Sequence, residues 1–414
     1  MADILFVAHR VPWPPDKGEK IRAFNMIRHL SRSHRVHLAA FVDDPADLGR
    51  ADELGRWCAS MRLARIDRAT RLQRMAMALL SGKALSVAVF DDAELRRWIR
   101  ERVEAGIDLA LGYSGAVAPL IDFTPTLFDL VDCDSAKWQA MARDRRGPAG
   151  WIYRREARIV ARLERQIAER SAATLLVSEP EAELCRAITG VTDGRIQAVA
   201  NGVDTELFDP GVRWPSPYPV DRRPTIVFTG VMNYAPNVEA VQWLHRHVWP
   251  CLREHPKRPR LAIVGSSPVA SIRTLADGDN VLVTGRVADI QPWLAHAAIA
   301  VAPLRLARGI QNKVLEAMAM ELPVVATAAA AEGIDARAGD HFLVADEPAD
   351  FTKALRNLLD QPQHARTIGR DARAQVIENH SWPARLAPLD DIIGQMMAEK
   401  SVSRRLRKDP GIVA

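Results

Sequence analysis

The stretch APLRLARGIQNKVLEAMAMELPVVAT, residues 302–327, predicts in turn a strand, a loop, a helix and a second strand. An apolar run comes first, and a loop with Arg305, Arg308 and Gly309 follows it. Apolar residues at helical spacing begin close to Ile310, before a second apolar run that is rich in valine. This order of elements predicts a parallel α/β unit.

The predicted helix carries a base and an acid in its first two turns, Lys313 and Glu316. Backbone N–H groups at a helix N-terminus and the helix dipole favour a phosphate, and Lys313 adds a charged donor nearby. Glu316 lies three positions later on the same face, where its carboxylate can accept two hydrogen bonds from a ribose diol. The alternative is an ordinary Lys and Glu pair on an exposed helix face.

Similar apolar runs alternate with helical stretches along the rest of the chain. In the first half they lie at residues 4–8, 36–42, 109–111, 126–131, 174–177 and 196–199. In the second half they lie at residues 225–229, 261–264, 281–283, 299–302, 324–326 and 342–344. This alternation is typical of parallel sheets that helices cover on both faces. We therefore predict an α/β fold with two doubly wound, Rossmann-like domains.

A proline-rich stretch separates the two predicted domains. The periodicity stops over residues 206–222, so we expect a linker there, an N-terminal domain over residues 1–205 and a C-terminal domain over residues 223–381. A helix over about residues 382–400 can pack back on the first domain, and a basic tail follows over residues 401–414. Two such domains are expected to face each other across a cleft, at the carboxyl ends of their strands, where α/β proteins bind ligands.

Composition restricts the class of protein further. The chain has 414 residues, a formal net charge of +5 and four cysteines. The cysteines lie far apart, with no CxxC pair and no histidine spacing that suits zinc, so we expect reduced thiols and no metal. The first residues do not form a signal peptide, and no run approaches the roughly 20 apolar residues of a membrane span. We expect a cytoplasmic protein, which can still lie at the inner face of the cytoplasmic membrane.

The segment over residues 302–327 resembles the donor-binding motif of the retaining GT-B glycosyltransferases of the group 1, or family 4, type. In that family a glycine-containing loop leads into a helix reading K-V-L-E-A-M-A, and a P-V-V strand follows. The resemblance implies that Glu316 binds the ribose of a nucleotide-sugar donor. The implied donor-binding residues of this segment are Arg305, Gly309, Asn312, Lys313 and Glu316.

One position departs from the family pattern. The family has two glutamates separated by seven residues, and Glu316 matches the second of them, whereas Arg308 stands in place of the first. Either Arg308 takes over a charge-pairing role or the donor sugar is held differently. Lys313 and Arg308 are the predicted catalytic residues of this domain.

Other motifs of the family follow in order along the chain. PPDKGEK, with Gly18, matches the first-domain loop that closes over the donor phosphates and the acceptor. TGVMNYAPN, with Gly230, matches the point where the backbone approaches the phosphates. VTGRV, with Gly285, Arg286 and Val287, matches the loop whose main chain contacts the base. NGVDTELFDP matches the end of the first domain. Each alone is compatible with a plain turn, and their order supports the resemblance.

Three segments are similar to a narrower group, the sugar transferases associated with exosortase (PEP-CTERM) exopolysaccharide systems. These segments are PWPPDKGEKIRAFNMIRHL, FDLVDCDSAKW and ARGIQNKVLEAMA. The similarity implies a lipid-linked or polysaccharide acceptor at the cytoplasmic face of the inner membrane.

Acidic residues after a predicted strand suggest a role in the first domain. Asp129, Asp132 and Asp134 lie at the end of the run over residues 126–131. Asp132 is the candidate for orienting the acceptor hydroxyl or stabilising positive charge at the anomeric carbon. The alternative is that one of the three caps the next helix. His9, after the first strand, is either a sugar contact or a structural histidine.

Residues 143–165 contain eight arginines against three acidic residues. Apolar residues recur there at helical spacing, which predicts an amphipathic basic helix. Such a helix can rest on anionic lipid, or it packs its apolar stripe on the domain core and leaves its arginines in water. Nucleic-acid binding is the weakest interpretation, because the arginines lack interleaved aromatic residues.

The sequence therefore predicts an enzyme that moves a sugar from a UDP- or GDP-linked donor to a glycan or lipid-linked glycan acceptor, with retention of configuration. No cofactor or metal is expected, since Lys313, an arginine and helix N-termini can neutralise the diphosphate. The alternatives are a nucleotide-sugar 2-epimerase and a non-catalytic partner that binds nucleotide sugars within a glycan-assembly complex.

Overall fold

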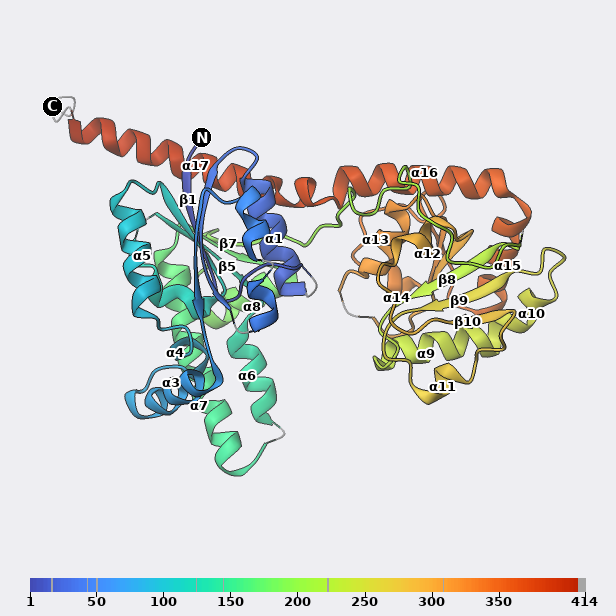
Figure 1. Ribbon diagram of the computed structural model, residues 1–414, viewed down its shortest axis with the longest axis horizontal. Coiled ribbons are helices and arrows are strands. Elements are labelled where there is room, and N and C mark those ends of the chain that lie inside the picture. Colours follow the sequence, from blue (N-terminus) through green and yellow to red (C-terminus); the bar gives the residue numbers. More distant parts are fainter. Residues whose placement is uncertain are drawn as a thin grey trace. The chain divides into compact units, whose positions relative to one another are not determined.

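The structure is a computed structural model that describes residues 1–15, 18–42, 44–49, 51–123, 125–143, 145–221, 223–307 and 309–408 (Figure 1). The chain divides into two compact units. The first consists of Met1–Asn201 with Arg385–Ala414, and the second of Gly202–Ala384.

The first unit contains a seven-stranded sheet in the order β3-β2-β1-β4-β5-β6-β7. All neighbouring strands are parallel. The strands are β1 Asp3–Ala8, β2 Arg35–Val42, β3 Ser60–Arg65, β4 Leu109–Tyr113, β5 Thr126–Val131, β6 Ala173–Leu176 and β7 Ile196–Ala198. The edge strand β3 was not predicted, because its sequence SMRLAR is only partly buried and lacks the continuous apolar run of the inner strands.

Helices pack on this sheet. Leu5, Val7, Ala39 and Phe41 of β1 and β2 share one core cluster with Leu95 and Ile99 of α5. The helices are α1 Gly18–Leu30, α2 Pro45–Leu48, α3 Arg68–Ser81, α4 Leu85–Ala88, α5 Ala93–Glu104, α6 Asp134–Arg143, α7 Gly147–Arg170 and α8 Glu179–Thr189. Short 3-10 turns lie at Ala51–Arg56 (η1) and Gly115–Leu120 (η2). Asp67 and Asp92 cap α3 and α5 by accepting backbone N–H bonds, which places the starts of both helices.

The basic helix predicted from residues 143–165 is α7, and its apolar stripe faces inward. Val160 and Ile167 are buried, and Leu163 packs against the same core cluster as Ile167. Ile152 packs against a small cluster that includes Ala78 of α3. This stripe is therefore used inside the unit and is not available to a bilayer.

The second unit contains a six-stranded parallel sheet in the order β10-β9-β8-β11-β12-β13. Its strands are β8 Thr225–Thr229, β9 Arg260–Val264, β10 Val281–Val283, β11 Ile299–Ala302, β12 Val324–Ala326 and β13 Leu343–Val344. Its helices are α9 Ala235–Trp243, α10 Trp249–Arg253, α11 Ala270–Arg273, α12 Gln291–Ala295, α13 Asn312–Ala319, α14 Ala328–Ala331, α15 Pro348–Asp360 and α16 Pro362–Asn379. A π-helical turn, Leu244–Val248 (η3), joins α9 to α10. The two parallel sheets confirm the predicted fold class.

The last helix, α17 Trp382–Lys408, begins in the second unit and continues in the first. Lys400 Nζ lies 2.9 Å from Asp108 Oδ1, and His29 Nε2 lies 2.8 Å from Asp390 Oδ2. This ion pair of Lys400 and this hydrogen bond of His29 attach α17 to the first unit. None of the described helices is both long enough and apolar enough to cross a membrane.

A buried ion pair fixes the carboxyl end of β5 in the first unit. Arg22 of α1 and Asp129 of β5 are both almost fully buried, and two guanidinium nitrogens lie 2.7 and 2.9 Å from Asp129 Oδ2. Val131 N donates to the other carboxylate oxygen at 2.9 Å, and Arg22 Nη1 donates to Asn201 Oδ1 at 2.9 Å. The pair thus joins α1, β5 and the last residue before the second unit.

Replacing Asp129 by Ala should reduce the free energy of unfolding by about 3 to 5 kcal/mol, because it leaves the Arg22 charge buried without its partner. Urea unfolding of the full chain, followed by circular dichroism, measures the loss. The double variant Arg22→Met/Asp129→Leu should recover much of it, since neither charge remains. An equal loss in the double variant would mean that packing rather than charge pairing accounts for the effect.

Candidate functional site

The strand order of the second sheet marks where a ligand is expected. From β8 the chain proceeds outward through β9 and β10 on one side, and it then returns to add β11, β12 and β13 on the other. The order therefore reverses between β8 and β11, and α/β sheets bind ligands at the carboxyl ends of the strands at such a point. Gly230 directly follows β8, and α13 is the helix that follows β11.

Lys313, in the first turn of α13, reaches this edge of the sheet. Its Nζ donates a 2.6 Å hydrogen bond to Asn237 Oδ1 of α9 and lies 4.5 Å from the centroid of the Phe228 ring of β8. A Cβ atom added to Gly230 would come within 3.1 Å of the same nitrogen. Burial lowers the pKa of Lys313 to about 8. The ammonium is held at the switch point by an amide and an aromatic face, and neither of these neutralises its charge.

Glu316 follows Lys313 on the same side of α13 and is half-buried. Burial raises the pKa of Glu316 to about 7, although the nearby Lys313 charge acts to lower it. Among the residues that the structure describes, none forms a hydrogen bond or an ion pair with this carboxylate. A half-buried acid without a protein partner is a natural binding group for a ligand's hydroxyls.

Two glycines bring the backbone close to this site. Gly230 and Gly265 follow β8 and β9 with φ of +159° and +150°. A Cβ on Gly265 would lie 1.7 Å from the carbonyl oxygen of Gly230, so these two loops are in direct backbone contact. Only glycine fits at position 265. Gly265 was missed from the sequence, although a glycine directly after a predicted strand is the same signal that selected Gly230.

The loop after β10 joins these two. Thr284 Oγ1 accepts a 3.3 Å hydrogen bond from Gly265 N and donates a 2.8 Å bond to Gly285 O. Gly285 has φ of +71°, Arg286 is exposed, and Val287 packs against the core of the unit. The structure therefore brings the predicted residues Gly230 and Gly285 to one edge of the sheet, with Gly265 between their loops.

The loop between β11 and α13 carries the remaining predicted donor residues. Arg305 is exposed and lies 3.5 Å from Glu239 Oε1 of α9. Gly309 has φ of +65°, and its carbonyl accepts a hydrogen bond from Gln311 Nε2. Asn312 is exposed at the first position of α13, so the helix begins two residues later than the predicted start at Ile310. Gln311 is extended (φ −88°, ψ 97°), which delays the start. Arg308 lies outside the described residues.

In the first unit, Asp132 lies just beyond β5 with its charge paired. Lys137 Nζ lies 2.8 Å from Asp132 Oδ2 and 3.1 Å from Asp134 Oδ1. Val131, immediately before Asp132, has φ of +68°, a conformation that is costly for a β-branched residue. Asp134 is the first residue of α6. Asp132 is therefore held in a strained turn and shares one lysine with Asp134.

A second polar group lies at the ends of β1 and β4. His9 Nε2 is 3.4 Å from Glu19 Oε2, and Arg10 also pairs with Glu19. The hydrogen bonds from His9 and then Arg10 lower the pKa of Glu19 to about 2. Tyr113 Oη donates a 2.8 Å hydrogen bond to the Glu19 backbone carbonyl. Glu19 directly follows the predicted Gly18 at the start of α1, and sequence reasoning missed it.

Within the described ranges, no three histidine, cysteine or acidic side chains gather closely enough to hold a metal ion.

Most of the second unit matches a known protein family. Residues 223–361 match the family model described as Glycosyl transferases group 1. This match contains β8 to β13, Gly230, Gly285 and α13 with Lys313 and Glu316. No curated protein sequence matches the chain.

Solved structures match nearly the whole chain. Sucrose-phosphate synthase from Thermosynechococcus elongatus superposes with a TM-score of 0.61 and 17% sequence identity, covering 96% of this chain and 100% of that one. Anabaena HepE in complex with UDP superposes with a TM-score of 0.59 and 14% sequence identity, covering 95% of this chain and 100% of that one. A glycosyltransferase from Rickettsia africae superposes with a TM-score of 0.58 and 13% sequence identity, covering 96% of this chain and 98% of that one. These likenesses establish the two-domain GT-B fold.

The shifted acidity of Glu316 predicts how pH changes the stability of the protein without ligand. Between pH 4.5, the ordinary value, and about 7, the folded chain holds a proton that the unfolded chain has lost. Below pH 4.5 the carboxyl is protonated in both states, so Glu316 does not reduce the free energy of unfolding there. That free energy falls as the pH rises above 4.5 and through about 7. Glu316→Gln removes this loss, so its melting temperature should rise relative to wild type from pH 4.5 to 7 and then level off.

Differential scanning fluorimetry from pH 4.5 to 7.5 measures this difference. Glu347→Gln, which removes an exposed carboxylate from the same unit, controls for the loss of a negative charge. A difference between Glu316→Gln and wild type that stays constant across the range would contradict the assigned burial of the Glu316 carboxylate.

Proposed function

We propose that this protein is a glycosyltransferase that moves a sugar from a nucleotide-sugar donor to a glycan or lipid-linked glycan acceptor. The observation that carries this proposal is the pair on α13. Lys313 and Glu316 lie at the switch point of the second sheet, within the segment that matches the group 1 family. A structural neighbour, HepE, is solved with UDP and with UDP-glucose, which supports a UDP-linked donor. A GDP-linked donor is the alternative.

We assign each of these residues a different task toward the donor. The Lys313 ammonium meets the diphosphate, replacing a neutral environment with an anionic partner. Glu316 accepts hydrogen bonds from the ribose diol, which provides the partner that the protein itself does not. Gly230, Gly265 and Gly285 allow the backbone to approach the nucleotide closely. We propose that no resident metal takes part, and we expect donor turnover to be unchanged by added EDTA.

The remaining residues complete this proposal. Arg308 would add a second positive charge beside the diphosphate, in place of the glutamate of the family pattern. Asp132 would orient the acceptor hydroxyl or stabilise the positive charge that develops at the anomeric carbon, with Lys137 as its ion-pair partner. Retention of the anomeric configuration is proposed from the sequence resemblance.

The biological setting is proposed from sequence similarity. Three segments are similar to the exosortase-associated sugar transferases, and they support a role in exopolysaccharide synthesis at the cytoplasmic face of the inner membrane. Because the first glutamate of the family pattern is missing, an alternative function is a protein that binds nucleotide sugars without transferring them.

Two experiments separate these possibilities. Thermal shifts with UDP, GDP, ADP and CMP identify the nucleotide, since a ligand at one hundred times its dissociation constant stabilises the folded state by about 2.7 kcal/mol. Product analysis after incubation with the matching nucleotide sugars then separates three outcomes. Release of the nucleoside diphosphate with a new glycosidic bond supports the proposal. An epimerised free donor, or binding without turnover above the uncatalysed rate, contradicts it.

The two residues of α13 should affect the kinetics differently. Lys313 faces charge that grows on the leaving diphosphate, so Lys313→Ala should lower kcat as well as donor affinity. Glu316 binds the ribose equally in the ground and transition states, so Glu316→Gln should mainly raise the donor KM. Losing a charged hydrogen bond costs about 1.5 to 3 kcal/mol, or roughly ten- to hundredfold in kcat/KM.

Steady-state kinetics on purified variants measures both effects. Lys353→Ala and Glu347→Gln are matched controls, since both change exposed charges of the same unit. Folding is checked by circular dichroism. Wild-type kcat and KM in both folded α13 variants would place the donor site elsewhere.

A further inference from the structure

Helix α3 presents an apolar face to solvent. Leu72, Met77 and Leu80 are 59%, 60% and 84% exposed, and Ala76 lies exposed among them. At about 100° per residue, these four positions fall within an arc of roughly 140°, on one side of the helix. We name these four residues the α3 apolar face. With Leu79, which is 40% exposed, the helix has four large apolar side chains open to water, and packing within the unit does not explain them.

The opposite side of α3 is firmly held, so the outward face is not due to a loose helix. Ala78 is buried in a cluster with Leu85 and Ala88 of α4. Arg155 of α7 is also buried, and its Nη2 donates 2.9 Å hydrogen bonds to the carbonyls of Ala78 and Lys83.

The group that anchors α3 is itself paired. Arg155 Nη1 lies 2.5 Å from Glu156 Oε1, and Glu156 Oε2 accepts a 2.7 Å hydrogen bond from Leu85 N. Closer to the middle of α3, Arg74 Nη1 donates a 2.8 Å hydrogen bond to the Val89 carbonyl. These buried bonds fix the rotation of α3 about its axis, and that rotation keeps the α3 apolar face outward.

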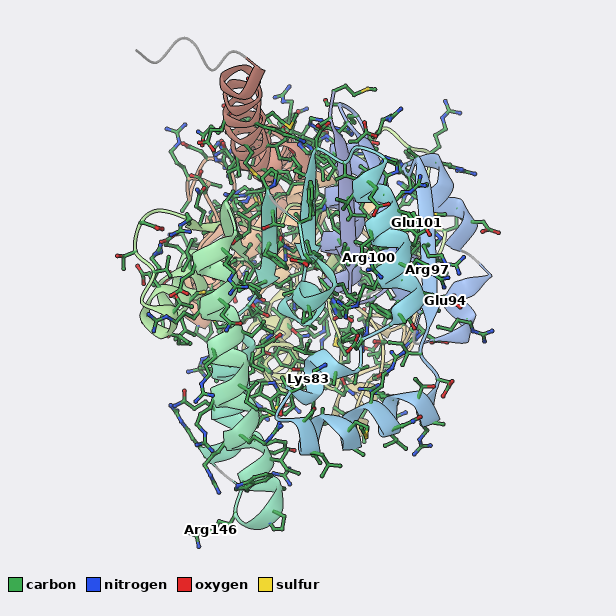
Figure 2. All side chains as sticks on the ribbon, turned by 90° about the vertical axis from the view of Figure 1, so that its left-hand side faces the viewer. Lys83, Glu94, Arg97, Arg100, Glu101 and Arg146 are labelled. Atoms are coloured by element: carbon green, nitrogen blue, oxygen red, sulfur yellow. The ribbon has the colours of Figure 1, made fainter. Side chains whose placement is uncertain are left out.

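A nearby helix of the same unit shows the usual arrangement. In Figure 2, α5 presents Glu94, Arg97, Arg100 and Glu101 along its outward side. Its apolar residues Leu95 and Ile99 are buried in the core. The contrast with α3 is one of orientation, because both helices are amphipathic and only α3 turns its apolar side to water.

The helix α3 also carries exposed positive charge. Arg68 and Arg71 are exposed on α3 itself, and the helix contains no acidic residue. Lys83, just after the helix, is paired with the Asp91 carboxylate at 3.4 Å, and Arg146 directly precedes α7, at the outer tip of that helix in Figure 2. Trp151, in the second turn of α7, is 54% exposed beside Ile152, which packs against the α3 cluster. Apolar residues with an indole and a rim of basic side chains match the boundary of an anionic bilayer.

We propose that α3 lies flat in the interface of an anionic membrane, with its apolar face among the acyl chains and Trp151 of α7 beside it. Arg68 and Arg71 then contact the lipid phosphates. The lipid-binding surface is thus α3 rather than the stripe of α7, which is packed inside the unit. This proposal does not depend on the donor site, since it concerns only residues of the first unit.

Vesicle sedimentation of the full chain tests the proposal. The lipids are phosphatidylcholine alone, and phosphatidylcholine with about 30% phosphatidylglycerol, whose negative surface attracts basic side chains. Wild type should bind the anionic vesicles only, and less at high salt. Leu72→Gln/Leu80→Gln should weaken that binding by about tenfold or more, since two apolar side chains that the bilayer would bury are lost. Arg68→Gln/Arg71→Gln should weaken it and reduce its dependence on salt.

Matched variants separate this surface from general effects. Arg97→Gln/Arg100→Gln removes the same charge from α5, and Leu184→Gln/Leu207→Gln removes two other exposed leucines. Both should bind as wild type does. Equal binding to neutral and anionic vesicles, or undiminished binding by the α3 variants, would overturn the proposal. So would a wild-type dimer, seen by light scattering, that Leu72→Gln/Leu80→Gln dissociates, because a second copy would then cover α3.

Discussion

The second unit is organised around the cost of keeping two charged groups partly out of water. Burial shifts the pKa values of Lys313 and Glu316 toward each other, to about 8 and about 7. The two charges attract each other, but their other neighbours do little to offset this cost. Lys313 contacts an amide and an aromatic face, and no described residue forms a hydrogen bond or ion pair with Glu316. A site built only for stability would pair or expose such groups. The arrangement leaves binding capacity for a ligand with an anionic group and hydroxyls.

The parallel sheet makes this arrangement possible. Its strands all end at one edge, so loops that are far apart in sequence meet there. The contact between Gly230 and Gly265 sets the spacing of two of these loops, and Thr284 joins the third. Asn237, which holds Lys313, also donates to the Val231 carbonyl in the loop after β8. The lysine is thereby positioned by the same loop that leaves room for it.

Local pattern was sufficient for the second unit and for α13, and it failed where distant contacts decide. Continuous apolar runs identify inner strands, whereas the half-exposed β3 has no such run. Lys313 and Glu316 are three residues apart, so helical spacing alone predicts a shared face. Arg22 and Asp129 are 107 residues apart, and nothing local indicates that they pair. Sequence periodicity reveals an amphipathic helix but not which side faces the core. For this reason α7 was a candidate membrane surface and α3 was not.

Donor binding in the proposed site would also move protons. A diphosphate beside Lys313 favours its charged form and raises its pKa from about 8, so the lysine takes up protons near neutral pH. Hydroxyl donors to Glu316 favour its ionised form and lower its pKa from about 7, so the acid releases protons. The two changes have opposite signs and partly cancel, because both groups titrate close to neutrality. The pair can therefore become a full ammonium and carboxylate on binding while the net exchange of protons with the solvent stays small.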